Sequence, residues 1–280
     1  MKIGIESSAY FGTTGAADGL ARLKMHGFQA VDYQLFVDTE NDLFAMSDAE
    51  FEEHLKRDRM LATALGIEIS QTHGPWRYPP RDFTPEEREE RFEKMARSLK
   101  GTRLLGCKYM VIHPIMPFGT GEQPDPMSYM EINSEFFRRL CAAAAQEQVI
   151  ICLENMPFPE LPLSRPSEIL AFVKEIDSPW LRVCLDTGHC AVCGVSPTDA
   201  VRELGAEYLR VMHVHDNSGA TDSHWLPYYG IIDWPGFTCA LHEIGFDGVL
   251  SLECAVSGKL PHDILEYHQI GLALIAKSLT

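Results

Sequence analysis

The stretch "RVMHVHDN", residues 210–217, places two histidines and a carboxylate at the end of a run that is otherwise typical of a buried strand. Side chains alternate between the two faces of a strand, so His213 and His215 point to one face and Asp216 to the other. Apolar residues come first and possible metal ligands come last. The pattern predicts a strand whose tip opens onto a site that binds a cation or moves protons.

Five other strand-like runs end in a side chain that can bind a metal. These side chains are His73, His113, Glu154, Asp186 and Glu253. If the strand ends meet at one rim, the carboxylates repel one another and their pKa values rise, whereas a divalent cation removes that cost and uses the imidazoles as neutral donors. Each residue alone also has a structural interpretation, as a hydrogen-bonded core side chain or, for "DTGH" at 186–189, as a turn. The single CxxC of Cys190 and Cys193 is weak as a redox or zinc signal.

The elements that would position these side chains repeat along the chain. Short β-branched runs recur at residues 2–7, 30–36, 67–73, 109–114, 149–155, 181–189, 209–216 and 248–254. Between them, helical segments are predicted at 48–66, 84–106, 196–205, 233–245 and 262–279. Asp48 is expected to cap the first of these, and Thr84 followed by Pro85 is expected to begin the second.

Eight strand–helix units with nearly all-apolar strands predict an α/β fold, a single (β/α)₈ TIM barrel over residues 1–280. A doubly wound open sheet is the alternative. It is less favoured because "SSAYFGTTG", after the first strand, lacks the spacing of a glycine-rich phosphate turn. The proline-rich runs at 74–85 and 155–166 are predicted to be long loops. In such a barrel all strand ends open on one face, where active sites lie.

Composition excludes several classes of protein. The chain has 280 residues, 45% of them hydrophobic, and a formal net charge of −16, which disfavours binding to nucleic acid or to an anionic membrane surface. The sequence contains no apolar run of about 18 residues that could span a membrane. The N-terminus is interpreted as a first strand and not as a signal peptide, and several of the eight cysteines lie in apolar runs. We therefore expect a cytoplasmic protein with reduced thiols.

The succession "LEN", "DTGH", "HVHD", "DSH" and "LE" resembles the xylose isomerase-like barrel superfamily over nearly the whole chain. That group contains sugar isomerases and epimerases, inosose and 3-dehydroshikimate dehydratases, and endonuclease IV. The resemblance implies a metal held by Glu154, Asp186, His213 and Glu253. His213 is chosen because "HVHD" matches a His-x-x-Asp pattern with Asp216, and His215, where many relatives carry Lys, is given a substrate role.

The resemblance to endonuclease IV extends to further residues. The positions where that enzyme has additional zinc ligands are occupied here by His73, His113, His189, Asp222 and His224. It implies either a site with more than one metal or polar contacts to substrate hydroxyl groups. The run "HWLPYYGIIDW" departs from the family, because Tyr228 and Tyr229 stand where many relatives show Gly-Glu-Gly. The shape of the substrate pocket is therefore expected to differ.

The expected function is a divalent-metal-dependent epimerase or isomerase of a sugar, keto-sugar or cyclitol, working through an enediolate. Glu154 and Glu253 would exchange protons with the substrate, and His189 would bind a substrate oxygen. The pocket aromatics are expected to be Tyr10, Trp76 and Trp225, although each is equally suited to plain packing. The mixed ligands favour Mn²⁺ or Zn²⁺, with Co²⁺ and Mg²⁺ as alternatives.

Other functions stay open at this point. A lyase or dehydratase needs the same metal and base, and an endonuclease IV-like phosphodiester hydrolase with several zinc ions is disfavoured by the acidic charge. A non-catalytic barrel that binds sugar is a further alternative. A free sugar is favoured over a sugar phosphate because Arg77, Arg81 and Lys259 are isolated along the chain. The partner is expected to be a small carbohydrate, with no nucleic acid and no membrane; relatives are often homo-oligomers.

Overall fold

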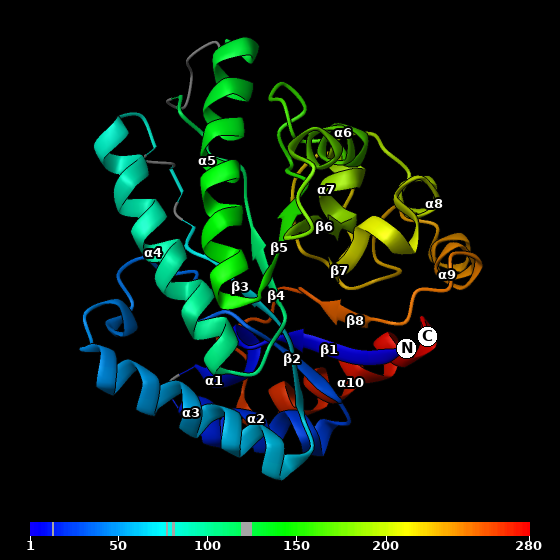
Figure 1. Cartoon of the computed structure of the whole chain (residues 1–280). Coiled ribbons are helices and arrows are strands. Elements are labelled where there is room, and N and C mark those ends of the chain that lie inside the picture. The colour runs from blue at the N-terminus through cyan, green and yellow to red at the C-terminus, as the bar shows by residue number, and fades with distance from the viewer. Residues whose placement is uncertain (13, 77, 80–81, 119–124) are drawn as a thin grey trace.

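The described residues form eight parallel strands in one sheet that closes into a barrel (Figure 1). The computed structural model describes residues 1–12, 14–76, 78–79, 82–118 and 125–280. The strands are β1 (Lys2–Glu6), β2 (Ala30–Tyr33), β3 (Glu68–His73), β4 (Tyr109–Ile112), β5 (Ile150–Glu154), β6 (Leu181–Asp186), β7 (Leu209–His213) and β8 (Val249–Leu252). They pair in the order β7-β6-β5-β4-β3-β2-β1-β8. The ring closes where Val214, just after β7, bridges to Leu252. The predicted TIM barrel is confirmed.

Helices surround the strands on the outside (Figure 1). They are α1 (Ser8–Phe11), α2 (Gly15–His26), α3 (Asp48–Leu65), α4 (Pro85–Leu104), α5 (Pro126–Glu147), α6 (Pro166–Ile176), α7 (Thr187–Val192), α8 (Pro197–Tyr208), α9 (Trp234–Glu243) and α10 (His262–Ser278), with a 3₁₀ turn η1 (Asp42–Phe44). None of the described helices is both long enough and apolar enough to cross a membrane. The eight cysteines are all described, and all are free.

Local sequence explains where the longer helices begin. Thr84 caps α4, as predicted: its side chain accepts the backbone N–H of Glu87, and Pro85 occupies the first helical position. For α3 the predicted cap was one residue late. Ser47 is the cap and forms a capping box with Glu50, because its hydroxyl can accept the third N–H of the helix while Asp48 already has helical geometry.

The barrel interior is divided into layers by the alternation of the strands. Val111, Cys152, Cys184 and Val211 are inward-facing, buried and in mutual contact. The inward residues two positions further along the same strands are His113, Glu154, Asp186 and His213. A floor of small apolar side chains therefore separates the polar end of the barrel, at the carboxyl ends of the strands, from the opposite end.

Candidate metal and catalytic centre

Each of the eight strands has an ionisable side chain at its last or second-last residue, or directly after it, that faces inward or toward the rim. The ring consists of Glu6, Asp32, His73, His113, Glu154, Asp186, His213 and Glu253. Six of these were predicted from the sequence, whereas Glu6 and Asp32 were missed. Neighbours around the ring are in register: Glu6 lies beside Asp32, and Asp186 beside His213. The barrel thus gathers groups from the whole length of the chain at one rim.

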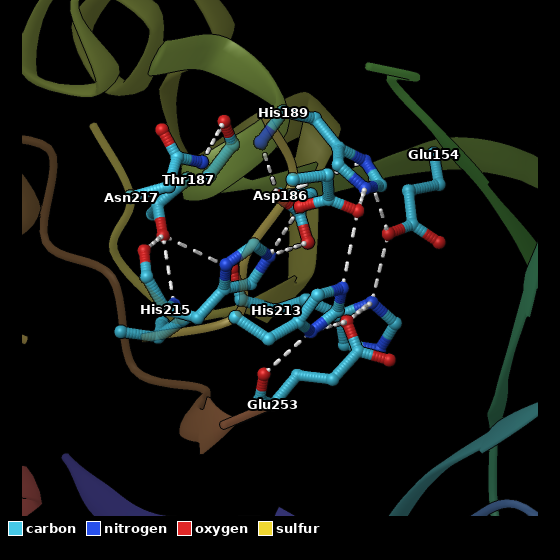
Figure 2. A network of polar contacts seen from close by, with 12 residues as sticks. Glu154, Asp186, Thr187, His189, His213, His215, Asn217 and Glu253 are labelled. Atoms are coloured by element: carbon cyan, nitrogen blue, oxygen red, sulfur yellow. Dashed lines mark hydrogen bonds and ion pairs between the residues drawn. The ribbon is translucent and has the colours of Figure 1, made fainter. Parts of the chain in front are cut away.

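The four residues predicted as metal ligands converge (Figure 2). One ligand atom from each of Glu154, Asp186, His213 and Glu253 lies within 4.8 Å of the others. His213 Nδ1 is 2.8 Å from Glu154 Oε1 and 3.3 Å from Glu253 Oε2. Three carboxylates and one imidazole, nearly all buried, form a donor set that fits a divalent cation, because such an ion offsets the repulsion among the acids.

Histidines control the charge of the buried acids. Burial opposes ionisation of the Glu154 carboxyl, but the neighbouring His213 and His113 outweigh it and hold its pKa well below the usual range. Burial likewise opposes ionisation of Asp186, and His189 and His215 outweigh it, so the pKa of Asp186 is lowered. Both acids are therefore anionic and able to coordinate a cation near neutral pH.

Asp32 fixes the orientation of His213. Its Oδ2 lies 3.0 Å from His213 Nε2 and also accepts a hydrogen bond from Gln71 at 3.1 Å. With Nε2 held by this carboxylate, the other ring nitrogen, Nδ1, faces Glu154 and Glu253. A carboxylate behind a ligating imidazole sets its tautomer and increases its basicity.

Glu6 adds an acid next to Glu253. Burial and the charge of Glu253 raise the pKa of Glu6 to about 7. Gln34 donates to Glu253 Oε1 at 3.2 Å, so Glu253 is held on one side while its side chain stays 15% exposed. Glu253 is thus the carboxylate of the central set that is most open to solvent, since Glu154 and Asp186 are buried.

His73 and His113 lie on the other side of Glu154. His113 Nε2 is 2.9 Å and His73 Nε2 3.4 Å from Glu154 Oε2. Burial lowers the pKa of His113 to about 4, so this imidazole is neutral, and its buried Nδ1 has no hydrogen-bond partner among the described residues. His73, Glu154 and His213 form a second set whose ligand atoms lie within 4.8 Å of one another.

A third set combines His189, His215, Asp222 and His224. Asp222 Oδ2 lies 3.2 Å from His189 Nε2 and 3.1 Å from His224 Nε2. Burial opposes protonation of His189 and His224, but neighbouring carboxylates, chiefly Asp186 for His189 and Asp222 for His224, raise each pKa to about 10. His215 Nε2 is 2.9 Å from Asp186 Oδ2, so this set adjoins the central one (Figure 2).

Members of all three sets line a cavity of about 370 Å³. Its polar wall contains His73, His113, Glu154, His189, Asp222, His224 and Glu253. The apolar part of its lining includes Trp76, Tyr78, Met156 and Phe158. Among the described residues that line this cavity there is no Lys or Arg. Arg77 and Arg81, considered above as isolated cations, lie outside the described residues.

Two of the three predicted pocket aromatics lie near the site. Trp76 lines the cavity and meets His113 edge-on, with ring centroids 4.4 Å apart. Trp225 is 41% exposed and lines an adjoining cavity. The placement of Tyr10 was wrong: it is buried on α1, its hydroxyl 2.9 Å from His26 Nδ1, because the chain turns away from the rim directly after β1.

The structure does not place His215 where the substrate role expected for it would require. It is fully buried between Asp186 and the ring of His224, whose centroid lies 4.0 Å from its own. It does not line the cavity among the described residues, so it contacts the ionisable cluster and not the space that a substrate would occupy.

The sequence of the chain matches a family model and several known proteins. A family model described as xylose isomerase-like TIM barrel matches residues 20–273. An uncharacterized protein of Methanocaldococcus jannaschii is 30% identical over 188 residues, which are 62% of this chain and 62% of that protein. A probable endonuclease 4 of Mycoplasmoides gallisepticum is 26% identical over 156 residues, 52% of this chain and 49% of that protein. The matches thus span less than two thirds of these relatives.

Solved structures share the whole barrel. A D-psicose 3-epimerase with D-tagatose from Clostridium cellulolyticum H10 has a TM-score of 0.80 at 18% identity, covering 100% of this chain and 99% of that one. A D-tagatose 3-epimerase-like protein has a TM-score of 0.74 at 24% identity, covering 100% of both chains. A protein named IOLI, solved with a bound zinc atom, has a TM-score of 0.75 at 16% identity, covering 100% of this chain and 96% of that one. At these identities the likeness establishes the fold.

Proposed function

Because the chain belongs to the xylose isomerase-like TIM barrel family, we propose that it is a divalent-metal-dependent epimerase or isomerase of a small carbohydrate. The observation that carries the proposal is the convergence of Glu154, Asp186, His213 and Glu253 within 4.8 Å of one another beside a cavity of about 370 Å³. A cavity of this size accommodates one sugar ring or open-chain sugar.

These four residues would hold the cation, and Mn²⁺ or Zn²⁺ suits one imidazole and three carboxylates best. The buried acids and the Asp32-held imidazole support a fixed site. When bound, the cation supplies Lewis-acid stabilisation of negative charge that develops next to a carbonyl group. IOLI, which shares the fold, was solved with a bound zinc atom, and this supports the proposal of a divalent metal.

Glu154 and Glu253 are the proposed proton-transfer groups. They come from β5 and from the end of β8, on different sides of the ring, so they can meet a bound sugar from different directions. One removes the proton next to the carbonyl and the other returns a proton to the opposite face, which inverts that carbon. If a single carboxylate serves two neighbouring carbons, the same groups interconvert an aldose and a ketose.

The remaining polar wall would position hydroxyl groups. His189, Asp222 and His224 line the cavity next to the central set and offer both donors and acceptors. Trp76 gives the apolar wall a flat surface against which the C–H face of a sugar can stack. Since the described lining holds no Lys or Arg, a free sugar, keto-sugar or cyclitol fits better than a sugar phosphate.

A lyase or dehydratase acting on a related keto-sugar would use the same proton abstraction, followed by loss of a hydroxyl group. A second candidate of another kind is favoured by one observation, the additional ligand sets around His73 and around Asp222. Several metals side by side are typical of phosphodiester hydrolases. The net charge of −16 and the absence of described cations in the cavity lining disfavour a nucleic-acid substrate.

Metal analysis followed by an exchange assay tests the proposal. The purified protein is expected to contain about one firmly bound divalent metal per chain, and ketoses or keto-glycosides in deuterated water should acquire deuterium at one carbon. An isomerase that shifts hydride would incorporate none. About three metals per chain with cleavage of a phosphodiester, and no exchange on any sugar, would replace this proposal by the hydrolase.

A further inference from the structure

The connection from β7 to α9, residues 214–233, is held in a defined shape by one buried carboxylate. Asp216 accepts the Nε1–H of Trp234 at 2.9 Å and the backbone N–H groups of Gly230 at 3.0 Å and Ile232 at 3.3 Å. Its backbone also pairs with that of Trp225 through two hydrogen bonds of 2.8 Å. Charge-assisted bonds of this kind fix a loop before any ligand arrives.

This fixed loop exposes large apolar side chains. Trp225 is 41% exposed, Tyr229 70% and Ile231 63%. His224 and Tyr228 have positive φ angles of 48° and 76°, a backbone conformation that is costly for bulky residues. Strained residues and exposed aromatics on a rigid loop are typical of sites that contact a ligand.

Beside the loop lies a second, smaller cavity of about 260 Å³, the side cavity. It is lined by His224, Trp225, Leu226, Tyr229 and Ala255. His224 also lines the cavity over the metal-binding set, so the two cavities adjoin at this residue. The walls of the side cavity are almost entirely apolar, whereas the main cavity presents a wall of carboxylates and imidazoles.

We propose that the side cavity binds an apolar, aromatic substituent of the substrate while its sugar part occupies the main cavity. This rests on the proposed function. The substrate would then be a keto-glycoside or another keto-sugar derivative with an aryl group, not a bare monosaccharide. A bare sugar has no group that gains from contact with Trp225 and Tyr229, whereas a planar ring can stack on both side chains and leave water.

Paired ligands that differ only in the substituent test this inference. Binding of phenyl and methyl glycosides of glucose, galactose, mannose and xylose to the manganese-loaded protein is measured by calorimetry. For the sugar that binds best, the phenyl glycoside should bind about tenfold more tightly than the methyl glycoside, as expected for burial of one ring. In Trp225→Ala the two glycosides should bind equally, with the affinity for the methyl glycoside unchanged. Trp225→Phe should keep most of the preference for the phenyl glycoside.

The matched control is Tyr267→Ala, which removes an aromatic residue on α10 that is 74% exposed and lies outside both cavities. Its ratio should equal that of the unaltered protein. Equal binding of phenyl and methyl glycosides, or no binding of either, overturns the inference. Deuterium exchange on a free ketose in that case would leave the proposed function intact.

The exposed apolar residues of this loop could instead contact a second copy of the chain. Sedimentation of the unaltered protein and of Trp225→Ala decides this point. If Trp225→Ala converts a dimer into a monomer, the side cavity is covered in the assembly and the inference is overturned. An unchanged sedimentation coefficient together with the lost phenyl preference supports it.

Discussion

His213 contacts carboxylates with both ring nitrogens, and this divides the acids of the rim into two roles. Glu154 and Glu253 meet Nδ1, on the side where a cation and substrate would lie, whereas Asp32 meets Nε2 from behind. An acid on the Nδ1 side of the imidazole can coordinate a cation or accept a proton from a substrate. An acid behind it can only orient the ring and tune its basicity.

Replacing either proposed proton-transfer carboxylate should abolish turnover. Glu154→Gln and Glu253→Gln keep the side-chain shape but cannot accept a proton, so we expect a loss of at least about 10²-fold in kcat. The measurement is exchange of solvent deuterium into the best ketose substrate. Glu68→Gln, at the start of β3 and the opposite end of the barrel, is the control and should retain full activity. Full activity in both site variants would contradict the two-carboxylate mechanism.

Asp32→Asn should weaken metal binding without unfolding the barrel. The amide no longer carries the charge that faces His213 Nε2 at 3.0 Å, so metal affinity should fall about 10–100-fold. Titration of the metal-free protein with Mn²⁺ measures this loss. Asp58→Asn is the control, because Asp58 is an equally buried acid that accepts the Tyr33 hydroxyl outside the rim. Equal metal affinities in the two variants would contradict the role proposed for Asp32.

At the scale of elements, alternation along the strands was enough to predict six rim residues, but two strand ends were misjudged. The second run was taken as 30–36, whereas β2 ends at Tyr33, so Asp32 appeared to lie inside a strand and not at its tip. Glu6 was overlooked at the end of β1. Asp222 and His224 lie in a long connection without periodicity, so only the family resemblance pointed to them.

The misplacement of Tyr10 has a related cause. No pattern in "SSAYFGTTG" indicates that the chain forms the short helix α1 and packs Tyr10 against His26 of α2. The Tyr10 hydroxyl contacts His26 Nδ1, and His26 Nε2 in turn contacts Glu266 on α10. Such a contact joins residues about 240 positions apart, and short-range sequence patterns carry no information on it.

Glu266 should make stability depend on pH through the junction of α2 with α10. Its carboxylate accepts Arg22 at 2.7 Å and contacts His26 at 2.8 Å. Partial burial opposes ionisation, but His26 and Arg22 outweigh it and lower the pKa of Glu266. A lowered folded-state pKa means stabilisation that is present above the ordinary carboxyl value of 4.5 and is lost as the pH falls below it.

Glu266→Gln is therefore expected to cost about 1 kcal/mol of unfolding free energy at pH 7. The difference from the unaltered protein should shrink toward zero in urea titrations carried out below the ordinary carboxyl pKa. Glu175→Gln, on the exposed side of α6, removes a glutamate that has no hydrogen bond or ion pair in the described structure, and it should change stability at neither pH. A constant difference at both pH values would contradict the electrostatic explanation.

At the scale of the whole molecule, barrel closure is what creates the site. The ring closes between β7 and β8 through Val214 and Leu252, one residue beyond His213 and one before Glu253. Without that closure Glu253 would not approach His213 and Glu154. The fold was predictable because eight apolar runs recur at regular spacing, while the distances around the rim depend on closure and could not be read from spacing.

Removal of the proposed cation should destabilise the entire barrel, because the acids at the rim come from strands all around it. When the concentration of free cation is about 100 times its dissociation constant, binding adds about 2.7 kcal/mol to the unfolding free energy. Treatment with a chelator should therefore lower Tm by several degrees, and addition of Mn²⁺ or Zn²⁺ should restore it. Differential scanning calorimetry measures both steps. An unchanged Tm, with metal analysis showing complete removal, would argue against a structural contribution of the metal.

The ring of eight ionisable residues also bears on how new activities could arise on this scaffold. Each strand already delivers a group that can take up or release a proton, and the small apolar floor beneath them insulates these groups from the rest of the interior. Directed evolution starting here would not need to install catalytic groups. Exchanging one acid for an amide, or one imidazole for an acid, changes the distribution of charge around the rim and leaves the apolar layer beneath it unchanged.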